Sequence, residues 1–269
     1  MFQSDAPVKN PVFSFYPSLC GPLRAVVSIP HSGEDVPEVF KPHLTDDTRA
    51  MQEDVDTKVN ELVDIPALQA AGIGVLVAHI HRVCVDINRD EDNCILCWKE
   101  NTKGLRLVVK DPSRDEARSF LERYHRPYFE VLGSLILELE RTLSGKVPVV
   151  DLHSMPSAPT AYHRKQNPNQ KTHRANFCLS DQRGKTAEPE FINAFVEDLR
   201  GREYEVAVND PYVGGYVTTF VDRYRTNNIQ IEINRRLYMD EFSRELVPAK
   251  VQALKPQLTA CLIKNLTKN

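Results

Sequence analysis

Pro148-Val-Val-Asp-Leu-His-Ser-Met-Pro156 starts as the inside of a buried strand and then places acidic and basic side chains where apolar residues should continue. Asp151 and His153 are two residues apart, so on a strand they lie on the same side of the sheet. Burying such groups is costly unless they are paired or serve a function. We therefore interpret this stretch as a strand that ends at a metal site.

The rest of the chain predicts a sheet around this strand. Short runs rich in Val and Ile alternate with longer helical patterns, and near-continuous apolar runs suit strands covered on both faces. The expected strands are 25–29, 74–78, 83–87, 147–150, 176–179, 204–208 and 229–233. The expected helices are 56–71, 113–145, 189–199 and 240–262. This alternation predicts one α/β domain over residues 1–269, with three α/β/α layers and a central mixed, mostly parallel sheet.

The longest expected helix carries two local signals. Ser113 and Glu116 have the spacing of a capping box, which indicates where the helix begins. Pro127 lacks a backbone N–H, so it should kink this helix or split it. Residues 90–112 and 154–174 fit neither pattern, and we expect them to be active-site loops.

Composition narrows the class of protein. The 269 residues are 41% hydrophobic and 26% charged, with a net charge of −3. This balance predicts no nucleic-acid or membrane partner, and no signal peptide or long apolar run is evident. We expect a cytoplasmic protein, and the sequence leaves its oligomeric state open.

Six cysteines are scattered along the chain, which favours reduced thiols over a disulfide framework. Cys94 and Cys97 form the one C-x-x-C pair. No second pair of ligands stands at a matching spacing, so a structural zinc site is not indicated. We interpret the pair as loop residues, with a redox or metal role as the alternative.

Three residues near strand ends predict a metal centre. His31 follows the first long strand, His153 follows the apolar run of the opening stretch, and Asp56 begins the next expected helix. Carboxyl ends of strands are where sites form in open α/β sheets. A His/Asp/His set is a common ligand combination for a catalytic zinc with an open position. Glu232, inside a buried strand, would then be the general base.

Each of these residues also has a simpler reading. His153 alone could be a hydrogen-bonded residue, Asp56 a helix N-cap, and Glu232 an ion-pair partner of an arginine. Asp54 or Glu34 could replace Asp56 as the third ligand. Asp151 could accept the second ring N–H of a metal-bound histidine.

A second group of residues predicts an anionic substrate. Arg82 precedes an expected strand and Asn88-Arg89 ends it. An arginine side chain can clamp a carboxylate with two parallel hydrogen bonds. Alternatively, these arginines pair with Asp86 or Glu91. The turn-rich segment 209–216 has paired glycines that would let backbone approach a ligand, or that make a tight connection.

With these residues assembled, the chain resembles the N-formylglutamate amidohydrolase family. The motifs that carry the resemblance occur in family order: Ser28-Ile-Pro-His-Ser-Gly33, Asp54-Val-Asp56, Arg82 with Val85-Asp-Ile-Asn-Arg89, Asp151-Leu-His-Ser-Met-Pro156, Asn209-Asp-Pro-Tyr-Val-Gly-Gly-Tyr216 and Gln230-Ile-Glu-Ile-Asn-Arg-Arg-Leu-Tyr-Met-Asp240. The resemblance implies a zinc-dependent exopeptidase-like (phosphorylase/hydrolase-like) fold. It also implies hydrolysis of an N-acyl amino acid, in the founding case N-formyl-L-glutamate to formate and glutamate in histidine degradation.

The resemblance also implies roles for individual residues. It supports His31, Asp56 and His153 as the ligands of one zinc ion and Glu232 as the catalytic carboxylate. Arg82, Asn88 and Arg89 match positions that hold substrate carboxylates. In the implied mechanism, zinc lowers the pKa of a water molecule, Glu232 takes its proton, and the metal with Ser154 or an arginine stabilises the oxyanion.

The chain departs from the family pattern at three places. The loop after Arg89 looks shorter, Thr218-Thr219 stand where a threonine-arginine pair is usual, and Lys58 replaces an aromatic-histidine pair. These differences leave the identity of the amino acid open. The alternatives are an amidohydrolase for another N-acyl amino acid or small peptide, and a non-catalytic ligand-binding relative. Zn, Mn, Co and Fe(II) all accept such ligands.

Overall fold

An eight-stranded sheet forms the centre of the protein, whose structure, a computed structural model, describes residues 8–268. The strand order is β1-β2-β4-β3-β5-β8-β6-β7. The strands are β1 (Val8–Lys9), β2 (Phe13–Tyr16), β3 (Ala25–Ile29), β4 (Ile73–Ala78), β5 (Val147–Met155), β6 (Phe177–Ser180), β7 (Val206–Val208) and β8 (Thr226–Asn234). β5 and β8 are the longest, and they pair over their whole length, from Val147 opposite Thr226 to Met155 opposite Asn234.

The four central strands β4, β3, β5 and β8 are parallel to one another. Their carboxyl ends therefore meet at one edge of the sheet. β2 and β6 pair with this block in the antiparallel direction, on its two sides, so the sheet is mixed but mostly parallel. This edge is where a site is expected in an open α/β sheet.

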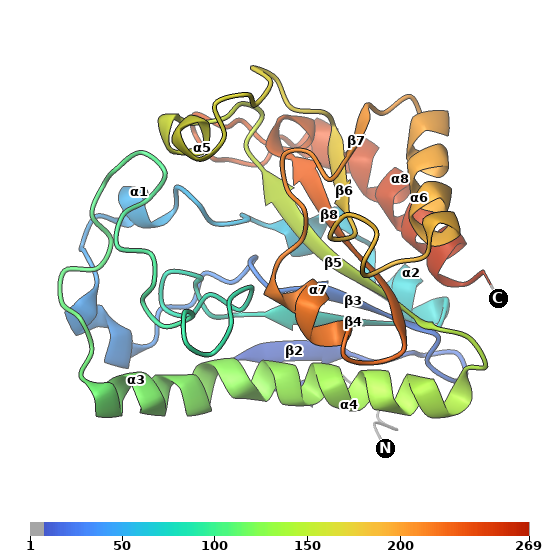
Figure 1. Ribbon diagram of the computed structural model, residues 1–269, viewed down its shortest axis with the longest axis horizontal. Helices are drawn as coiled ribbons and strands as arrows, with labels where there is room; N and C mark the ends of the chain where they lie inside the picture. The colour runs from blue at the N-terminus through green and yellow to red at the C-terminus, as the bar shows by residue number, and fades with distance from the viewer. Residues whose placement is uncertain (1–7, 269) are drawn as a thin grey trace.

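Helices cover both faces of the sheet (Figure 1). The helical segments are η1 (Glu38–His43), α1 (Thr48–Met51), η2 (Val59–Leu62), α2 (Ile65–Ala70), α3 (Arg114–Phe120), η3 (Leu121–His125), α4 (Arg126–Thr142), α5 (Ala161–Gln166), α6 (Pro189–Gly201), α7 (Tyr216–Val221), η4 (Arg235–Leu237) and α8 (Pro248–Leu266). α4 and α7 pack on one face, and α2, α6 and α8 pack on the other. The predicted three-layer α/β/α fold class is confirmed.

Alternating side chains of the strands supply two separate hydrophobic cores. On β5, Val149 belongs to the core under α4, whereas Val150 and Leu152 belong to the core under α6 and α8. Because side chains of a strand alternate between faces, Asp151 and His153 lie on the α4 side of the sheet. The polar residues of the opening stretch thus share one face.

One predicted strand and one predicted helix need correction. Residues 83–87 are not a strand, because they form turns with a single bridge from Val85 to Ile95. Their apolar side chains fill the core without joining the sheet ladder. The edge strands β1 and β2 were not predicted. The helix expected over 56–71 is broken into η2 and α2, with Lys58 in the left-handed region (φ 59°) and Asp64 capping α2.

The last helix is shorter at its start than predicted, since α8 begins at Pro248 rather than at residue 240. The capping box of Ser113 and Glu116 is present at the start of α3, as predicted. The long helix absorbs Pro127 through a π-helical turn, η3, in which the N–H of Arg126 bonds to the carbonyl of Leu121. The proline therefore disturbs the hydrogen-bond ladder without dividing the rod, which runs along one face of the sheet in Figure 1.

The six cysteines are all unpaired, and four of them are buried. None of the helices between residues 8 and 268 is long and apolar enough to cross a membrane.

Gly33 has no room for a side chain. A Cβ atom there would lie 2.3 Å from the carbonyl carbon of His79, because the 33–35 segment runs beside 79–81. We expect Gly33→Ala to lower the free energy of unfolding by about 1–3 kcal/mol, since the contact is with backbone that cannot turn away. Gly145→Ala, where no atom lies within 4 Å, is the control. Thermal or urea unfolding measures both, and equal stabilities of the two variants would contradict this reading.

Candidate metal centre and active site

Three elements bring His31, Asp56 and His153 together. His31 follows β3, His153 lies near the carboxyl end of the adjacent β5, and the backbone N–H of Asp56 donates to the carbonyl of His31 at 3.3 Å. One ligand atom of each residue lies within 4.8 Å of the others, and all three residues are buried. In the described part of the chain, this is the one such group of three His, Cys, Asp or Glu residues.

The nitrogen atoms that face Asp56 are the Nδ1 atoms of the two histidines. Asp56 Oδ2 lies 3.1 Å from His153 Nδ1 and 3.5 Å from His31 Nδ1. His31 Nδ1 is buried and has no hydrogen-bond partner. A buried nitrogen lone pair without a partner, beside a carboxylate and a second imidazole, fits a metal ligand. Two imidazoles and a carboxylate are a donor set that zinc accepts.

A second carboxylate holds the far side of each ring. His31 Nε2 lies 2.6 Å from Asp86 Oδ1, and His153 Nε2 lies 2.7 Å from Asp151 Oδ2. When each Nε2–H donates to its carboxylate, each Nδ1 keeps its lone pair directed at Asp56. Such partners fix the tautomer of metal-binding histidines and raise their basicity. The sequence predicts Asp151 in this position, whereas it indicates Asp86 only as an alternative ion-pair partner of the arginines.

The charges of the site favour a cation between the three ligands. Burial opposes ionisation of Asp56, yet its interactions with the imidazoles of His153 and His31 hold its pKa well below the usual value. Burial also opposes protonation of His153, but Asp151 and Asp56 raise its pKa well above the usual value. Either a proton or a metal ion at Nδ1 of His153 would balance the negative charge of the surrounding carboxylates. The two exclude each other, because a nitrogen that binds a metal must be deprotonated.

The other oxygen of Asp56 is held by the protein. Asp56 Oδ1 accepts hydrogen bonds from Ser154 Oγ at 3.1 Å and from Arg235 Nη2 at 3.3 Å. Arg235 Nε also donates to Ser154 Oγ, and its Nη2 donates to the carbonyl of Val55. The structure therefore places Ser154, predicted as an oxyanion donor, with its hydrogen directed at Asp56. Arg235, which the sequence interpretation did not single out, fixes the rotamer of Asp56.

Glu232 faces the metal-ligand group from the neighbouring strand, in register with His153. Burial raises the pKa of Glu232 to about 8, although the positive charge favoured on His153 acts in the opposite direction. Gln230 Nε2 donates to Glu232 Oε1 at 2.8 Å, and Asn88 Nδ2 donates to Gln230 Oε1 at 3.3 Å. The carboxylate is thus oriented by a short chain of amides, of which Gln230 was not predicted.

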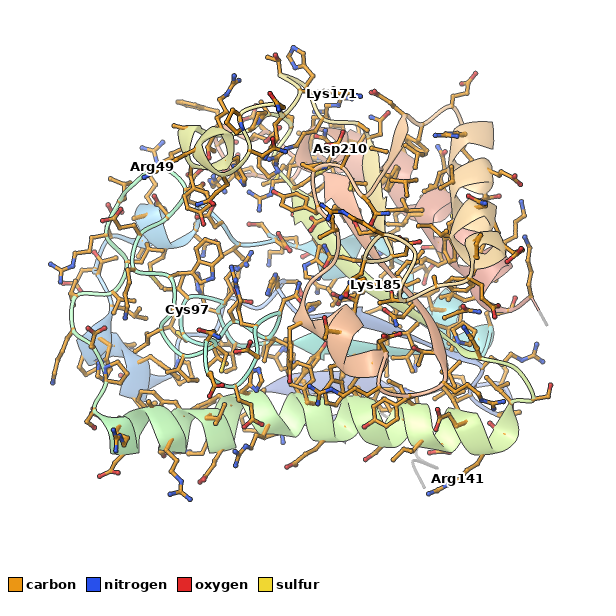
Figure 2. The ribbon with its side chains drawn as sticks, in the orientation of Figure 1. Arg49, Cys97, Arg141, Lys171, Lys185 and Asp210 are labelled. Carbon is orange, nitrogen blue, oxygen red and sulfur yellow. The ribbon has the colours of Figure 1, made fainter. Side chains whose placement is uncertain are left out.

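All the residues predicted for the site line a single cavity of about 450 Å³. They are His31, Asp56, Arg82, Asn88, Arg89, His153, Ser154 and Glu232. In Figure 2, Cys97 and Asp210 mark the loops that carry the neighbouring lining residues Trp98 and Pro211, and they lie on different sides of the strand ends. The cavity therefore lies between the sheet edge and loops from several parts of the chain.

The two arginines of the cavity have different surroundings. Arg82 donates to Asp86 Oδ2 at 3.0 Å and to the carbonyl of Asp54, and its charge is largely balanced there. Arg89 is about half exposed, and its Nε stays 3.9 Å from Asp86. Trp98 donates to the same Asp86 oxygen at 2.6 Å and lies against the guanidinium of Arg82. Of the two arginines, Arg89 is the one free to meet an incoming anion.

The alternative ligands lie in other surroundings. The carboxylate of Asp54 accepts hydrogen bonds from the backbone N–H and the hydroxyl of Thr102. Glu34 is exposed and lines a separate cavity beside α1. Burial raises the pKa of Cys94 and Cys97 to about 12, which disfavours the thiolate that redox chemistry requires.

The chain is similar to known proteins in both sequence and fold. The sequence model of the N-formylglutamate amidohydrolase family matches residues 23–239. The N-formylglutamate deformylase of Pseudomonas putida is 26% identical over 266 residues, covering 90% of this chain and 93% of that protein. The deformylase of Pseudomonas aeruginosa is 24% identical over 235 residues, covering 82% and 84%.

A solved structure extends the similarity to the fold. The crystal structure of N-formylglutamate amidohydrolase from Ralstonia eutropha JMP134 superposes with a TM-score of 0.83 at 26% identity, over 96% of this chain and 97% of that one. The matches cover nearly the whole length of the relatives, so they include both the sheet and the loops of the cavity.

Asp86 offers a test of the outer carboxylates. We expect Asp86→Asn to weaken zinc binding by roughly 10- to 100-fold, because His31 loses the charged acceptor that fixes its ring. Competition with a chromophoric chelator measures the affinity. Asp92→Asn, an exposed change in the same loop, is the control and should bind as the unchanged protein does. A lowered melting temperature with unchanged zinc affinity would assign Asp86 to the fold alone.

Proposed function

The chain belongs to the N-formylglutamate amidohydrolase family, and we propose that it hydrolyses N-formyl-L-glutamate to formate and L-glutamate with the help of one zinc ion. The observation that carries the proposal is the buried His31, Asp56 and His153 group with Glu232 beside it in one cavity. The same proposal extends to the finer expectations from the sequence, a place in histidine degradation and a cytoplasmic location.

His31 and His153 would hold the metal through Nδ1, and Asp56 through Oδ2. When bound there, a divalent ion supplies Lewis acidity, which lowers the pKa of water and polarises a carbonyl group. The unpartnered Nδ1 of His31 and the outer carboxylates on both rings support this assignment. Zinc is the metal we propose, because the set of two imidazoles and one carboxylate is its usual catalytic one.

Glu232 would move the proton. It accepts a proton from the attacking water and then passes it to the nitrogen of the leaving amine, so that the amide bond breaks without releasing a free amide anion. Burial raises its pKa to about 8, close to the range in which a group can both accept and donate a proton near neutrality. A divalent cation nearby and the N–H of Gln230 both favour the carboxylate form that the first step needs.

Arg89, Asn88 and Arg82 would receive the substrate carboxylates. Arg89 contributes a half-exposed guanidinium that no carboxylate clamps, whereas Arg82 contributes one largely balanced by Asp86. The side-chain amide of Asn88 is held by Gln230 and by the backbone N–H of Val217, which keeps it at the cavity wall. A Cβ atom on Gly215 would lie 2.1 Å from Asn88 Nδ2, so this position has no room for a side chain.

The proposal is tested by substrate specificity and metal dependence together. N-Formyl-L-glutamate, N-acetyl-L-glutamate, N-formyl-L-aspartate and N-formyl-L-methionine are offered to the protein with and without a chelator. We expect turnover of N-formyl-L-glutamate that the chelator abolishes and zinc restores. Chelator-sensitive turnover of another compound would keep the metal site and change the substrate. Turnover that survives metal removal would refute the zinc mechanism.

The role of Glu232 is tested by an isosteric change. Glu232→Gln should lower kcat by roughly 10²- to 10⁴-fold, because the amide cannot accept the proton of water. Zinc content should stay near one ion per chain, since Glu232 is not a proposed ligand. Glu190→Gln on the exposed side of α6 is the matched control and should leave kcat unchanged. Near-normal turnover of the Glu232 variant would remove this residue from the mechanism.

A further inference from the structure

Tyr212 lies in the turn-rich segment 209–216 and lines the same cavity as Glu232, but the mechanism above assigns it no role. Its ring comes from the loop between β7 and α7. The backbone of this loop is tied to the sheet, because Ser180 Oγ donates to the carbonyl of Tyr212 at 2.7 Å and the N–H of Gln182 donates to the carbonyl of Val213 at 2.8 Å. Tyr212 is therefore held in place before any ligand enters.

The ring N–H of His163, in α5, donates a hydrogen bond to Tyr212. The backbone N–H of Thr160 donates to His163 Nδ1 at 3.2 Å, so this nitrogen is an acceptor. Burial, and then the charge of Arg174, lower the pKa of His163 to about 4, so the ring is neutral and carries its hydrogen on Nε2. That N–H points at the hydroxyl oxygen of Tyr212, 3.2 Å away. Tyr212 must accept this hydrogen bond.

Arg174 supplies a second donor to the same oxygen. Its Nη1 lies 3.1 Å from Tyr212 Oη, and an arginine can only donate. A tyrosine oxygen has two lone pairs, and His163 and Arg174 occupy both. Burial raises the pKa of Tyr212 to about 12, so the hydroxyl keeps its hydrogen at neutral pH. No third partner of this hydroxyl occurs within residues 8–268, which leaves the hydrogen for a molecule in the cavity.

The position of Tyr212 points to the reacting end of the cavity. Cys178 Sγ donates to the backbone carbonyl of Tyr212 at 3.6 Å, and Cys178 lies opposite Glu232 in the pairing of β6 with β8. Glu232 is the proposed proton carrier and Arg235 holds Asp56. The guanidinium groups proposed for the substrate carboxylates, Arg82 and Arg89, lie instead around Trp98.

We propose that the hydroxyl of Tyr212 donates a hydrogen bond to the carbonyl oxygen of the scissile amide and stabilises the oxyanion that forms there. This inference rests on the proposed amide hydrolysis. Two donors to the tyrosine oxygen polarise its O–H bond and make it a stronger donor, and the rigid loop avoids reorganisation when negative charge develops. Tyr212 keeps its proton throughout, so Glu232 remains the group that transfers a proton.

Tyr212→Phe removes only the hydroxyl and tests the inference. We expect kcat to fall by roughly 10²-fold while KM stays within about twofold, because the hydrogen bond strengthens only as the oxyanion forms. Zinc content should not change, whereas the melting temperature should fall slightly, because the N–H groups of His163 and Arg174 lose a shared acceptor. Tyr204→Phe is the matched control, because Tyr204 lies outside the cavity and its ring packs on Phe177. A raised KM with unchanged kcat, or no kinetic change, would overturn the assignment.

A binding measurement separates this inference from the proposed function. N-Phosphoryl-L-glutamate carries a tetrahedral anionic group in place of the hydrated formyl group, and calorimetry on the zinc-loaded protein gives its affinity. Tyr212→Phe should weaken its binding by at least tenfold and leave the binding of L-glutamate unchanged. If the unchanged protein turns over none of the formyl compounds but shows this difference, the proposed substrate is wrong, whereas the hydrogen bond from Tyr212 to a tetrahedral anion is supported. Equal affinities of the two proteins for the phosphoryl compound would refute the role of Tyr212.

Discussion

The ionised carboxylate of Asp56 is the group on which the organisation of the site depends. It is buried, so its charge must be balanced, and its two oxygens are balanced in different ways. Oδ1 receives Ser154 and Arg235, whose hydrogen bonds come from the protein itself. Oδ2 faces only imidazole nitrogens, of which the Nδ1 atom of His31 has no partner. Because a buried carboxylate with one unbalanced side is costly, the fold favours a cation at that side. A metal ion meets this requirement, and it also explains why two histidines converge there.

The sheet accommodates this concentration of charge because it places polar side chains on one face and apolar side chains on the other. On β5 and β8, the side chains toward α6 and α8 are apolar and fill a core. The opposite side chains near the carboxyl ends are Asp151, His153, Gln230 and Glu232, which bond to one another or to the metal-ligand group. Since strand side chains alternate, one pair of neighbouring strands supplies both a dry core and a polar wall. Strand register therefore fixes His153, a proposed metal ligand, opposite Glu232, the proposed proton carrier, whereas His31 and Asp56 lie in the segments that follow β3 and precede η2.

The sequence was sufficient for the parts of the site that lie at strand ends. His31 and His153 could be found because polar residues follow or interrupt apolar runs there, and Asp56 because it begins the next expected helix at the same edge of the sheet. The strand predicted over residues 83–87 was wrong, because the apolar side chains of this run enter the core from turns and its backbone does not join the sheet. The sequence indicated Asp86 as an alternative partner of the arginines, and Arg82 does donate to it. Its second contact, with His31 Nε2, can be seen only in the folded structure. Gln230 had a usable signal, since polar and apolar residues alternate strictly from Asn228 to Asn234 and place it beside Glu232.

The contacts that the loops of the cavity make had no such signal. Thr160, His163, Arg174 and Tyr212 come from separate loops, and nothing in their spacing predicts that two donors converge on one hydroxyl. The cavity is also lined by residues from other segments, such as Arg89, Trp98 and Gly215. Loops tolerate substitution more readily than paired strands, because fewer backbone hydrogen bonds and packed side chains depend on them. A chain of this fold can therefore keep its metal ligands and proton carrier while its substrate contacts change. For this reason, family membership supports the reaction type more firmly than it supports the identity of the amino acid.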